Sequence, residues 1–240
     1  MSAPSFRPLY DQIKILLTQS LIAGEWHPGE SIPSEMDLAT RFGVSQGTVR
    51  KAIDELAAEN ILVRKQGKGT FVATHSEERM QFRFLRILAD TGDTEYPESE
   101  VVDCKRGKAS AEIAKAIELR PGAPVHVIKR VLSFGGRPII FDEIVLSANL
   151  FKGLAAQRLN EFEGSVYSFF EVRYGLRMIR AEERLTAVAA NEEAASRLGV
   201  ETGAPLLCVD RIAFTYGDKP VEWRRGLCRT NGYSYFNEIA

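Results

Sequence analysis

The chain has 240 residues and a formal net charge of −1, with 45% hydrophobic and 26% charged residues. These are the values of an ordinary globular protein, and the length accommodates one large domain or two modest ones. No apolar run approaches the length of a membrane span, and the N-terminus does not resemble a signal peptide. The three cysteines form an odd set without metal-ligand spacing. We therefore expect a cytoplasmic protein with reduced thiols and no bound metal.

The first predicted helix spans residues 7–23. Pro8 is tolerated in a first helical turn, and Gly24 is well placed to end the helix. Between them an apolar stripe is formed by Ile13, Leu16, Leu17 and Leu21. This stripe predicts that the helix packs behind the next two elements and completes a small core.

Residues 32–72 predict two short helices joined by a tight turn, and then a hairpin. Ser34 and Ser45 are suited to cap the two helices, and Gly43 makes the turn because glycine tolerates the backbone angles of a helix end. In the second helix the spacing i, i+3, i+4, i+7 is filled by Val49, Ala52, Ile53 and Leu56. Small, polar and basic residues remain for the opposite face: Gln46, Gly47, Arg50 and Lys51. Such a helix suits the major groove of DNA.

The hairpin predicted for residues 61–73 has a basic tip that contains glycine. Arg64, Lys65 and Lys68 accompany Gly67 and Gly69, a composition suited to contact phosphates or the minor groove. Residues 1–75 contain eight basic and eight acidic residues, whereas residues 41–72 contain six basic and three acidic ones. The positive charge is therefore local. Its arrangement, and not the overall charge, indicates a winged helix-turn-helix that binds DNA.

A polar, charged segment that begins near residue 74 predicts a boundary between two domains. We assign residues 1–75 to the DNA-binding domain, 76–82 to a linker and 83–240 to a second domain. The second domain contains an internal repeat, because the segment from Ala109 aligns without gaps with the segment from Ala190, at an offset of 81 residues. Each copy predicts a helix, a turn containing Gly-Ala-Pro, an arginine-bearing strand and a return strand.

The two copies predict a pseudo-symmetric antiparallel sheet with flanking helices, so that the whole chain is an α+β protein of two domains. Between the copies we expect a helix over residues 165–174, stopped by Gly175, and a strand near 176–188. A last strand is expected within residues 233–239.

Charged residues within the predicted strands need partners, because an unpaired charge is costly to bury. They are Arg130, Asp142, Arg211 and Glu222. Two interpretations stay open: these residues pair with one another for stability, or some of them converge on a polar ligand in a cleft between the two copies.

The N-terminal 73 residues resemble the GntR family of bacterial transcription regulators along their whole length. The matching motifs are Pro8-Leu9-Tyr10-x-Gln12-Ile13, Pro28-Gly29, Pro33-Ser34-Glu35, Leu38-Ala39, Val44-Ser45, Thr48-Val49-Arg50 and Gly67-x-Gly69-Thr70-Phe71-Val72. The remainder resembles the HutC-type effector domain, UTRA, whose fold is similar to that of chorismate lyase. Its motifs are Arg130 with Gly136-x-Pro138, Gly164-Ser165-Val166-Tyr167, Tyr174-Gly175-Leu176, Gly203-Ala204-Pro205-Leu206 and Gly217-x-x-Pro220-Val221-Glu222.

This resemblance implies a homodimer that binds a pseudo-palindromic operator and is released by a small-molecule effector, as a repressor. The helix positions that match the family's DNA contacts are Ser45, Gln46, Gly47, Thr48 and Arg50, with Gly67 and Lys68 at the wing tip. We add Ser34, Arg41 and Lys51 as neighbouring candidates. The positions that match the ligand cleft of sugar-phosphate-responsive relatives are Arg130, Asp142, Ser165, Glu222 and Cys228. Arg83 and Tyr233 complete the candidate effector site.

The chain departs from the family pattern at both sites. Gln46 and Gly47 stand where relatives commonly have arginine and a larger polar residue, which predicts a shifted operator preference because glutamine favours adenine and arginine favours guanine. Leu132, Asp142 and Cys228 stand where the relatives often have a second arginine, a glutamate and a tyrosine. An effector with less charge than a sugar phosphate, such as a carboxylate bound by Arg130 or Arg83, therefore fits as well.

Two further functions compete with a ligand-responsive regulator. One is a DNA-binding regulator whose second domain only dimerises, and the other is an enzyme of lyase-like fold. Catalysis needs a convergent set of acid, base or nucleophile. Cys228 is a conceivable nucleophile, but the three histidines, His27, His75 and His126, do not match positions near it. We therefore expect no enzymatic activity and no cofactor.

Overall fold

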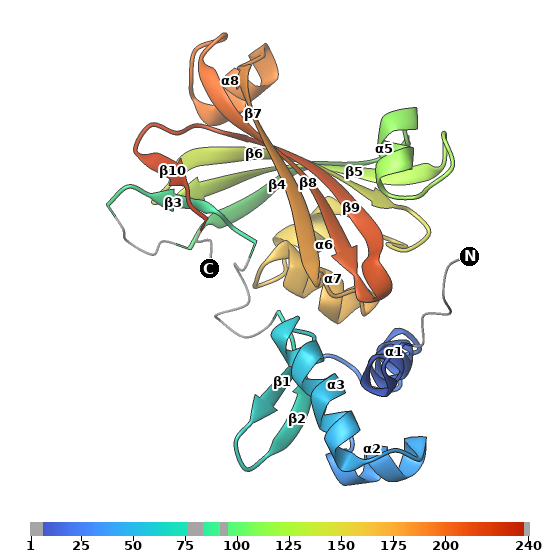
Figure 1. The fold of residues 1–240 in the computed structure, drawn as a ribbon. Helices are drawn as coiled ribbons and strands as arrows, with labels where there is room; N and C mark the ends of the chain where they lie inside the picture. Colours follow the sequence, from blue (N-terminus) through green and yellow to red (C-terminus); the bar gives the residue numbers. More distant parts are fainter. Residues whose placement is uncertain (1–6, 76–83, 92–95, 238–240) are drawn as a thin grey trace, which may run out of the picture.

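The structure is a computed structural model that describes residues 7–75, 84–91 and 96–237. Two domains follow one another along the chain, a small N-terminal head and a larger sheet domain (Figure 1). The linker predicted at 76–82 and Arg83 lie outside the described residues.

The head has the predicted winged helix-turn-helix architecture. Its elements are α1 (Leu9–Ile22), α2 (Glu35–Phe42), α3 (Gln46–Ala58), β1 (Leu62–Lys65) and β2 (Gly69–Val72). Ser34 and Ser45 cap α2 and α3, each accepting a hydrogen bond from the backbone N–H three residues on, and Gly43 ends α2 in the left-handed conformation at φ 65°. The predicted stripe of α3 is buried in the head core, together with Ile13, Leu17 and Leu21 of α1. Leu16, by contrast, is 41% exposed.

The second domain is built on one antiparallel sheet of six strands, in the order β4-β5-β6-β9-β8-β7. These strands are β4 (Glu98–Lys108), β5 (Pro124–Phe134), β6 (Arg137–Ser147), β7 (Arg180–Ala189), β8 (Pro205–Thr215) and β9 (Lys219–Cys228). A separate small sheet pairs β3 (Ile87–Ala89) with β10 (Tyr233–Tyr235). The strand expected within 233–239 therefore covers three residues, and β4 had no counterpart in the prediction.

The predicted repeat is visible in the topology of this sheet. Helix α5 (Ala111–Ala116) precedes the hairpin β5–β6, and helix α8 (Glu192–Leu198) precedes the hairpin β8–β9. The order of the strands is consequently symmetric about the central pair β6–β9. At that centre Glu143 lies opposite Arg225, which is its equivalent in the second copy.

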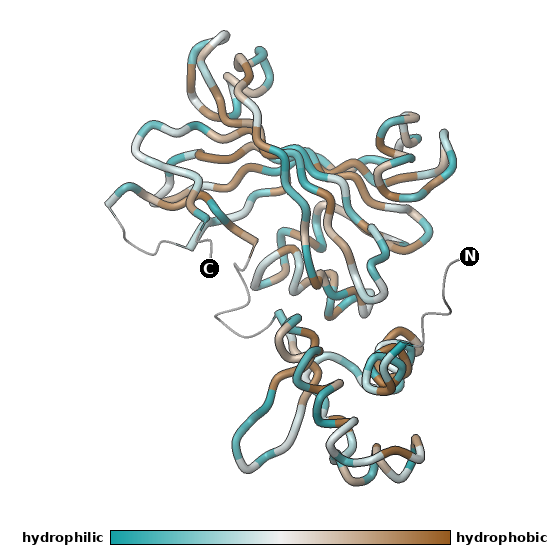
Figure 2. Tube along the Cα trace, in the orientation of Figure 1, coloured by the Kyte–Doolittle hydropathy of each residue, from teal (hydrophilic) through white to brown (hydrophobic). Residues whose placement is uncertain are grey.

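Helices cover both faces of the sheet (Figure 1). On the face away from the head, α8 packs on Val131 and Phe141, and α5 packs on Val125 and Val145. On the face toward the head lie α6 (Ala156–Asn160) and α7 (Val166–Tyr174), which is capped by Ser165 and ended by Gly175 as predicted. The hydropathy colouring in Figure 2 shows brown, apolar segments along the sheet between these layers.

The head and the sheet domain share apolar contacts. Ile179 is 8% exposed and belongs to the same core as α1 and α3, against which Tyr216 also packs. Tyr216 lies in a short turn, η1 (Tyr216–Asp218), where a Cβ on Gly217 would lie 3.3 Å from Ile22 Cδ1. The two domains are thus in direct contact through α1. Among the described residues, no helix is long and apolar enough to cross a membrane.

Candidate nucleic-acid interface and charged cavity

The predicted reading face of α3 is open to solvent. Gln46, Gly47 and Arg50 are exposed at the N-terminal end of the helix, while Val49 is fully buried beneath them. Ser45 Oγ lies 2.8 Å from Thr48 Oγ1 and accepts the Thr48 N–H at 3.2 Å. Ser45 and Thr48 therefore stabilise the first turn of the helix, whereas Gln46, Gly47 and Arg50 are exposed to solvent.

Glu35 links the reading helix to the wing, and sequence reasoning did not single it out for this. Its Oε2 accepts hydrogen bonds from Gln46 Nε2 at 3.3 Å and from Arg50 Nε at 2.9 Å. Its Oε1 accepts from Arg64 Nη1 at 2.9 Å, and Arg64 also donates to Asp54 Oδ1 at 2.7 Å. Burial raises the pKa of Glu35, but the hydrogen bonds from Arg50 and Arg64 outweigh it and leave that pKa lowered. One ionised carboxylate thus orients Arg50 and Arg64 together.

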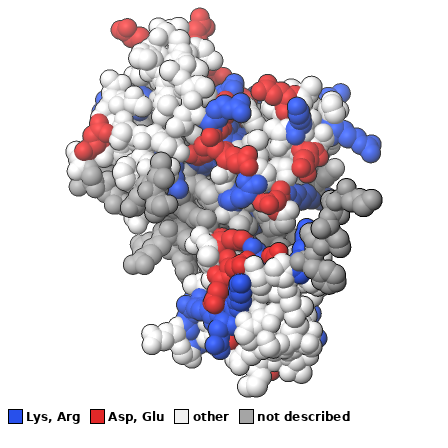
Figure 3. Space-filling view, viewed as in Figure 1, with Lys and Arg blue, Asp and Glu red and all other residues white. Residues whose placement is uncertain are grey.

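The other DNA-binding candidates lie around this centre. Gly67 and Lys68 are exposed at the tip of the hairpin, and the basic side chains gather over the hairpin side of the head (Figure 3). Lys51 is exposed and places its Nζ 3.8 Å from the centre of the Tyr10 ring. Ser34 is exposed at the start of α2. Arg41 is turned toward another part of the head, because it pairs with Glu25 and lies over Trp26.

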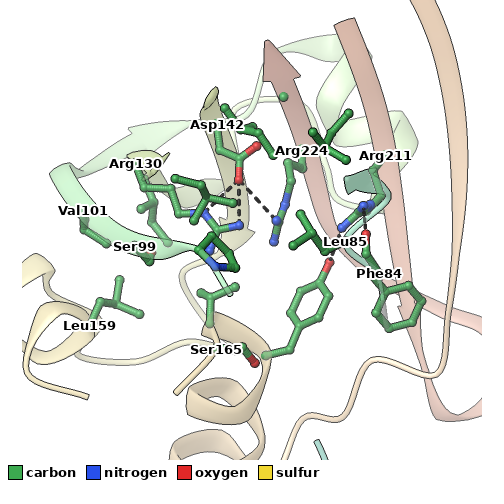
Figure 4. Close-up of a pocket in the computed structure, with 18 of the residues that line it drawn as sticks. Phe84, Leu85, Ser99, Val101, Arg130, Asp142, Leu159, Ser165, Arg211 and Arg224 are labelled. Atoms are coloured by element: carbon green, nitrogen blue, oxygen red, sulfur yellow. Dashed lines mark hydrogen bonds and ion pairs between the residues drawn. The ribbon is translucent and has the colours of Figure 1, made fainter. Parts of the chain in front are cut away.

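A cavity of about 410 Å³ lies on the face of the sheet that α6 and α7 cover. Its floor is formed by side chains that alternate along the strands and so share one face: Ile128, Arg130 and Leu132 of β5, Ile140 and Asp142 of β6, Val209 and Arg211 of β8, and Arg224, Gly226 and Cys228 of β9. Leu159 and Phe162, and Ser165, Tyr167 and Phe169 at the start of α7, line the opposite side, and Phe84 and Leu85 line the edge. Figure 4 shows the three arginines converging on this space.

Three of the arginines that line the cavity, Arg130, Arg211 and Arg224, are each paired with a buried or half-buried carboxylate. Arg130 donates to Asp142 Oδ2 at 2.8 Å, and Arg224 donates to Glu222 at 2.9 and 3.1 Å. Arg224 also reaches Asp142 Oδ2 at 3.3 Å, so Asp142 lies between two guanidinium groups. Burial raises the pKa of Asp142, but the charges of Arg130 and Arg224 outweigh it and keep that pKa below its usual value. Asp142 is therefore ionised in the folded protein.

Arg211 completes the cluster on its other side. It donates to Glu183 Oε1 at 2.6 Å and to the backbone carbonyl of Phe84, and its Nη1 lies 3.5 Å from Tyr167 Oη. Tyr167 in turn donates its hydroxyl to Glu222 at 2.8 Å. One network thus contains the four charged residues that the sequence analysis selected: Arg130, Asp142, Arg211 and Glu222. These residues belong to a network of ion pairs and hydrogen bonds, and this network borders a cavity.

The remaining effector candidates are placed as follows. Ser165 and Cys228 line the cavity, and Glu222 lies behind its wall with no exposed surface. Tyr233 is not among the lining residues, because its ring packs on Phe134 at 5.5 Å in a separate apolar cluster. Tyr235, two residues on and so on the same side of β10, does line the cavity.

Sequence reasoning missed Arg224, Tyr167 and Tyr235 as site residues. Arg224 carried a usable signal, because it lies two residues after Glu222 and four residues before Cys228 and so shares one face of a strand with both. Tyr167 lies within the motif Gly164-Ser165-Val166-Tyr167, from which only Ser165 was selected.

Helix α7 connects the cavity to the last residues of the head, directly before the linker. Its first turn lines the cavity with Tyr167, and one turn later Glu171 accepts hydrogen bonds from Thr74 Oγ1 and from the His75 N–H, the latter at 2.9 Å. Ser168 Oγ donates to the His75 carbonyl at 3.0 Å, and the His75 ring lies 5.8 Å from the Tyr167 ring. Burial raises the pKa of Glu171, although its hydrogen bonds oppose this.

The cavity does not offer the groups that catalysis at Cys228 would need. Burial raises the pKa of the Cys228 thiol far above its ordinary value, with the nearby Asp142 charge as the second cause, so the thiolate is suppressed. His126 lies on β5 and does not line the cavity. Within the part of the chain that the structure describes, no group of three or more His, Cys, Asp or Glu is placed to hold a metal ion.

Two family models match the chain and together span nearly all of it. The model described as "Bacterial regulatory proteins, gntR family" matches residues 9–72, and the model described as "UTRA domain" matches residues 94–234. Curated relatives agree over the whole length. The uncharacterised HTH-type transcriptional regulator YurK of Bacillus subtilis is 30% identical over 96% of this chain and 95% of its own. The HTH-type transcriptional repressor NagR of the same organism is 29% identical over 95% and 93%.

Solved structures resemble the second domain and the whole chain. The ligand-binding domain of a protein assigned to the GntR family of transcriptional regulators from Bordetella bronchiseptica is 45% identical, covers 67% of this chain and 99% of its own, and has a TM-score of 0.65. PhnF from Mycobacterium smegmatis is 22% identical over 95% of this chain and 99% of its own, with a TM-score of 0.55, and supports the fold alone.

Proposed function

Since the chain belongs to the GntR family of bacterial regulatory proteins and carries a UTRA domain, and so is a DNA-binding transcription regulator and not an enzyme, we propose that a small molecule in the cavity controls its binding to DNA. The protein acts as a homodimer in the cytoplasm, binds a pseudo-palindromic operator with one α3 in each half-site, and is a repressor. The names of NagR and of MngR, a repressor of mannosyl-D-glycerate transport and metabolism in Escherichia coli, support repression.

The observation that carries this proposal is the position of α7. One end of this helix lines the cavity through Tyr167, and Glu171, one turn on, holds Thr74 and His75, the last residues of the head before the linker. A ligand that displaces Tyr167 also strains the contact between Glu171 and His75. Binding in the cavity and the position of the head are therefore coupled through one rigid element.

The residues that line the cavity favour a domain that binds an effector over a domain that only dimerises. A closed, apolar interior would suit a dimerisation role, but this space of about 410 Å³ is lined by Arg130, Arg211 and Arg224. Volumes of this size are typical of small-molecule sites, in which a few polar groups orient a ligand in a mostly apolar enclosure.

At the head, Gln46, Gly47 and Arg50 are the residues proposed to read bases, and Gly67 and Lys68 to contact the backbone or the minor groove. Their exposure on one side of α3 and at the tip of the hairpin supports these roles. Ser45 and Thr48 are proposed to present backbone and hydroxyl groups to phosphates at the start of α3.

The proposal is tested by selecting operator sequences from random DNA with the full chain and measuring affinity by fluorescence anisotropy. We expect a two-fold symmetric site and a complex of two chains per operator by light scattering. R50A should lose specific affinity by about tenfold or more, because a good side-chain contact to a base contributes about 1–3 kcal/mol. K108A removes an exposed charge from the sheet domain and serves as the control. Equal losses in both variants, or selection of no symmetric site, would contradict the proposal.

A further inference from the structure

The cavity contains one donor and one acceptor of the same ion pair that are still available to a ligand. Arg130 uses Nε and Nη2 to bind Asp142 Oδ2, at 2.8 and 2.7 Å, and among the described residues no group accepts from its Nη1. Asp142 receives its hydrogen bonds from Arg130 and Arg224 on Oδ2, and within the same residues none reaches Oδ1. Both residues line the cavity and are 5% and 3% exposed. A ligand thus meets a cationic donor beside an anionic acceptor.

Gly226 keeps the space beside Asp142 Oδ1 open. It lies opposite Asp142 in the central strand pair and also lines the cavity. A Cβ at this position would be 2.9 Å from Asp142 Oδ1, closer than real contacts allow. Any other residue here would therefore cover or displace the free oxygen.

The cluster as a whole is already neutral. Three arginines, Arg130, Arg211 and Arg224, are matched by three carboxylates, Asp142, Glu183 and Glu222. Arg86 and Glu98, which also line the cavity, add one charge of each sign. A phosphate dianion would therefore bring uncompensated negative charge into a buried site, which is costly. A ligand without net charge is not penalised in this way.

Three further polar side chains of the cavity are occupied, whereas Arg86, Glu98 and Ser99, which also line it, make no side-chain hydrogen bond to the described residues. Asn160 bonds to the backbone of Val101 in both directions, at 2.8 and 3.0 Å. Ser165 Oγ caps α7 and lies 3.0 Å from Ser168 Oγ, and Tyr167 donates to Glu222. A sugar, with hydroxyl groups all round, would find few free partners among Asn160, Ser165 and Tyr167. The remaining lining is largely apolar: Val101, Ile128, Leu132, Ile140, Leu159, Phe162, Phe169 and Val209.

From these features we propose that the effector is a zwitterion with an apolar body, that is, a molecule with an ammonium group next to a carboxylate, as in an α-amino acid with an apolar side chain. The carboxylate accepts from Arg130 Nη1, and the ammonium donates to Asp142 Oδ1 over Gly226. The apolar body lies between the sheet and the residues of α6 and α7. This inference rests on the proposed function, because it names the ligand class of the same cavity.

The test compares matched ligands by isothermal titration with the full chain. L-Phenylalanine and L-leucine are compared with 3-phenylpropanoate and 4-methylpentanoate, which lack only the ammonium group, and with glucose 6-phosphate. We expect an amino acid to bind about 10- to 100-fold more tightly than its partner, the range of one hydrogen bond to a charged group. Equal or tighter binding of the acids, binding of neither amino acid, or preferential binding of glucose 6-phosphate would overturn the inference.

The variant D142N tests directly whether the charge of Asp142 sets the ligand preference. It removes one carboxylate and leaves the cluster with an excess positive charge, so the preference should reverse in favour of 3-phenylpropanoate. G226A keeps every charge but fills the space beside Asp142 Oδ1. It should weaken the binding of the amino acid more than the binding of the matched acid that lacks the ammonium group. E193Q, on the exposed side of α8, is the control and should bind like the unaltered protein. An unchanged preference in both D142N and G226A would refute the assignment.

Operator release is measured separately, by anisotropy of labelled operator in the presence of each ligand. If glucose 6-phosphate binds and releases DNA, the inference fails and the proposed function stands. If an amino acid binds with the predicted preference but leaves DNA affinity unchanged, the ligand class holds and the proposed response fails.

Discussion

Arg177 Nη1 donates to the backbone carbonyl of Asn60 at 2.7 Å, so a fully buried side chain of the sheet domain binds the backbone that follows the reading helix. Asn60 directly follows the C-cap of α3 and has a positive φ of 57°. On its other side, Arg177 Nε lies 3.6 Å from Glu171 of α7. Helix α7, which lines the cavity, and helix α3, which is proposed to read DNA, are therefore joined by one guanidinium group.

Replacing Arg177 should loosen the contact between the two domains. We expect R177M to lower the free energy of unfolding by about 3 kcal/mol, because breaking a buried ion pair leaves the other charge uncompensated. Amide hydrogen exchange at residues 57–62 should become faster than in the unaltered chain. The double variant E171Q/R177M should be less destabilised than the sum of the two single variants, since each removes the same interaction. Strict additivity would show that the pair is not coupled.

Glu35 should set the specificity of DNA binding and not its strength. In E35Q, Arg50 and Arg64 lose the carboxylate that orients them, while one negative charge beside the phosphates disappears. We expect affinity for scrambled DNA to rise and the ratio of operator to scrambled affinity to fall by about tenfold, the value of one well-placed base contact. Anisotropy titrations at two salt concentrations check this. D37N, which removes an exposed charge from the same helix, should leave the ratio unchanged.

Gln46 should account for part of the operator preference. Glutamine binds adenine in the major groove and arginine binds guanine, each worth about 1–3 kcal/mol of discrimination. Sequence selection with Q46R should therefore exchange adenine for guanine at one position in each half-site. If the unaltered protein already selects the usual half-site of its relatives, or Q46R selects the same site as the unaltered protein, Gln46 does not read that base.

His126 should make stability depend on pH between 5.5 and 7.5. It is 3% exposed, its Nε2 is buried without a hydrogen-bond partner among the described residues, and burial, followed by the charge of Arg106, lowers its pKa. The unfolded chain takes up a proton below about pH 6.5 that the folded chain resists, so stability falls as the pH falls through this range.

The measurement is denaturant unfolding at pH 7.5, 6.5 and 5.5. H126F removes the titrating group, and its stability should fall less over this range, by up to about 1.4 kcal/mol per pH unit. H27Q, at an exposed histidine, is the control. Asp142 does not interfere, because its lowered pKa confines its contribution to more acidic conditions. Parallel profiles for H126F and the unaltered chain would contradict the prediction.

Much of the fold followed from local pattern. The helix-turn-helix was predicted from Ser34, Gly43 and Ser45, because helix caps and left-handed turns depend on single residues. The hairpins β5–β6 and β8–β9 were predicted from the internal repeat. Strand β4 was missed because it carries a mixed, largely polar sequence at the edge of the sheet. Its pairing with β5 is a tertiary contact that no local period reports.

The site was predicted where charge stood out in an apolar strand, as at Arg130 and Asp142. It was missed where a role depends on a distant partner. Glu35 matters because Arg50 and Arg64 come to it from two other elements, and Arg177 because it reaches Asn60, 117 residues away. Tyr233 was chosen over Tyr235 because both lie on the same side of a short strand, and sequence alone does not show how far along that strand the cavity lies.

The internal repeat places unlike residues at like positions. Arg130 and Arg211 are equivalents in β5 and β8, but the equivalent of Asp142 in β9 is Arg224, after the single inserted residue of the second copy. If two identical subunits were related by a two-fold axis in place of the two copies, each side chain would occur twice in their shared cavity. Such a cavity would accept a ligand in either of two orientations. A duplicated unit within one chain has no such constraint. Among the residues that line the cavity, its halves have diverged to opposite charge at one pair of positions, Asp142 and Arg224. The two ends of the cavity therefore differ, and a molecule with two different ends can enter it in only one orientation.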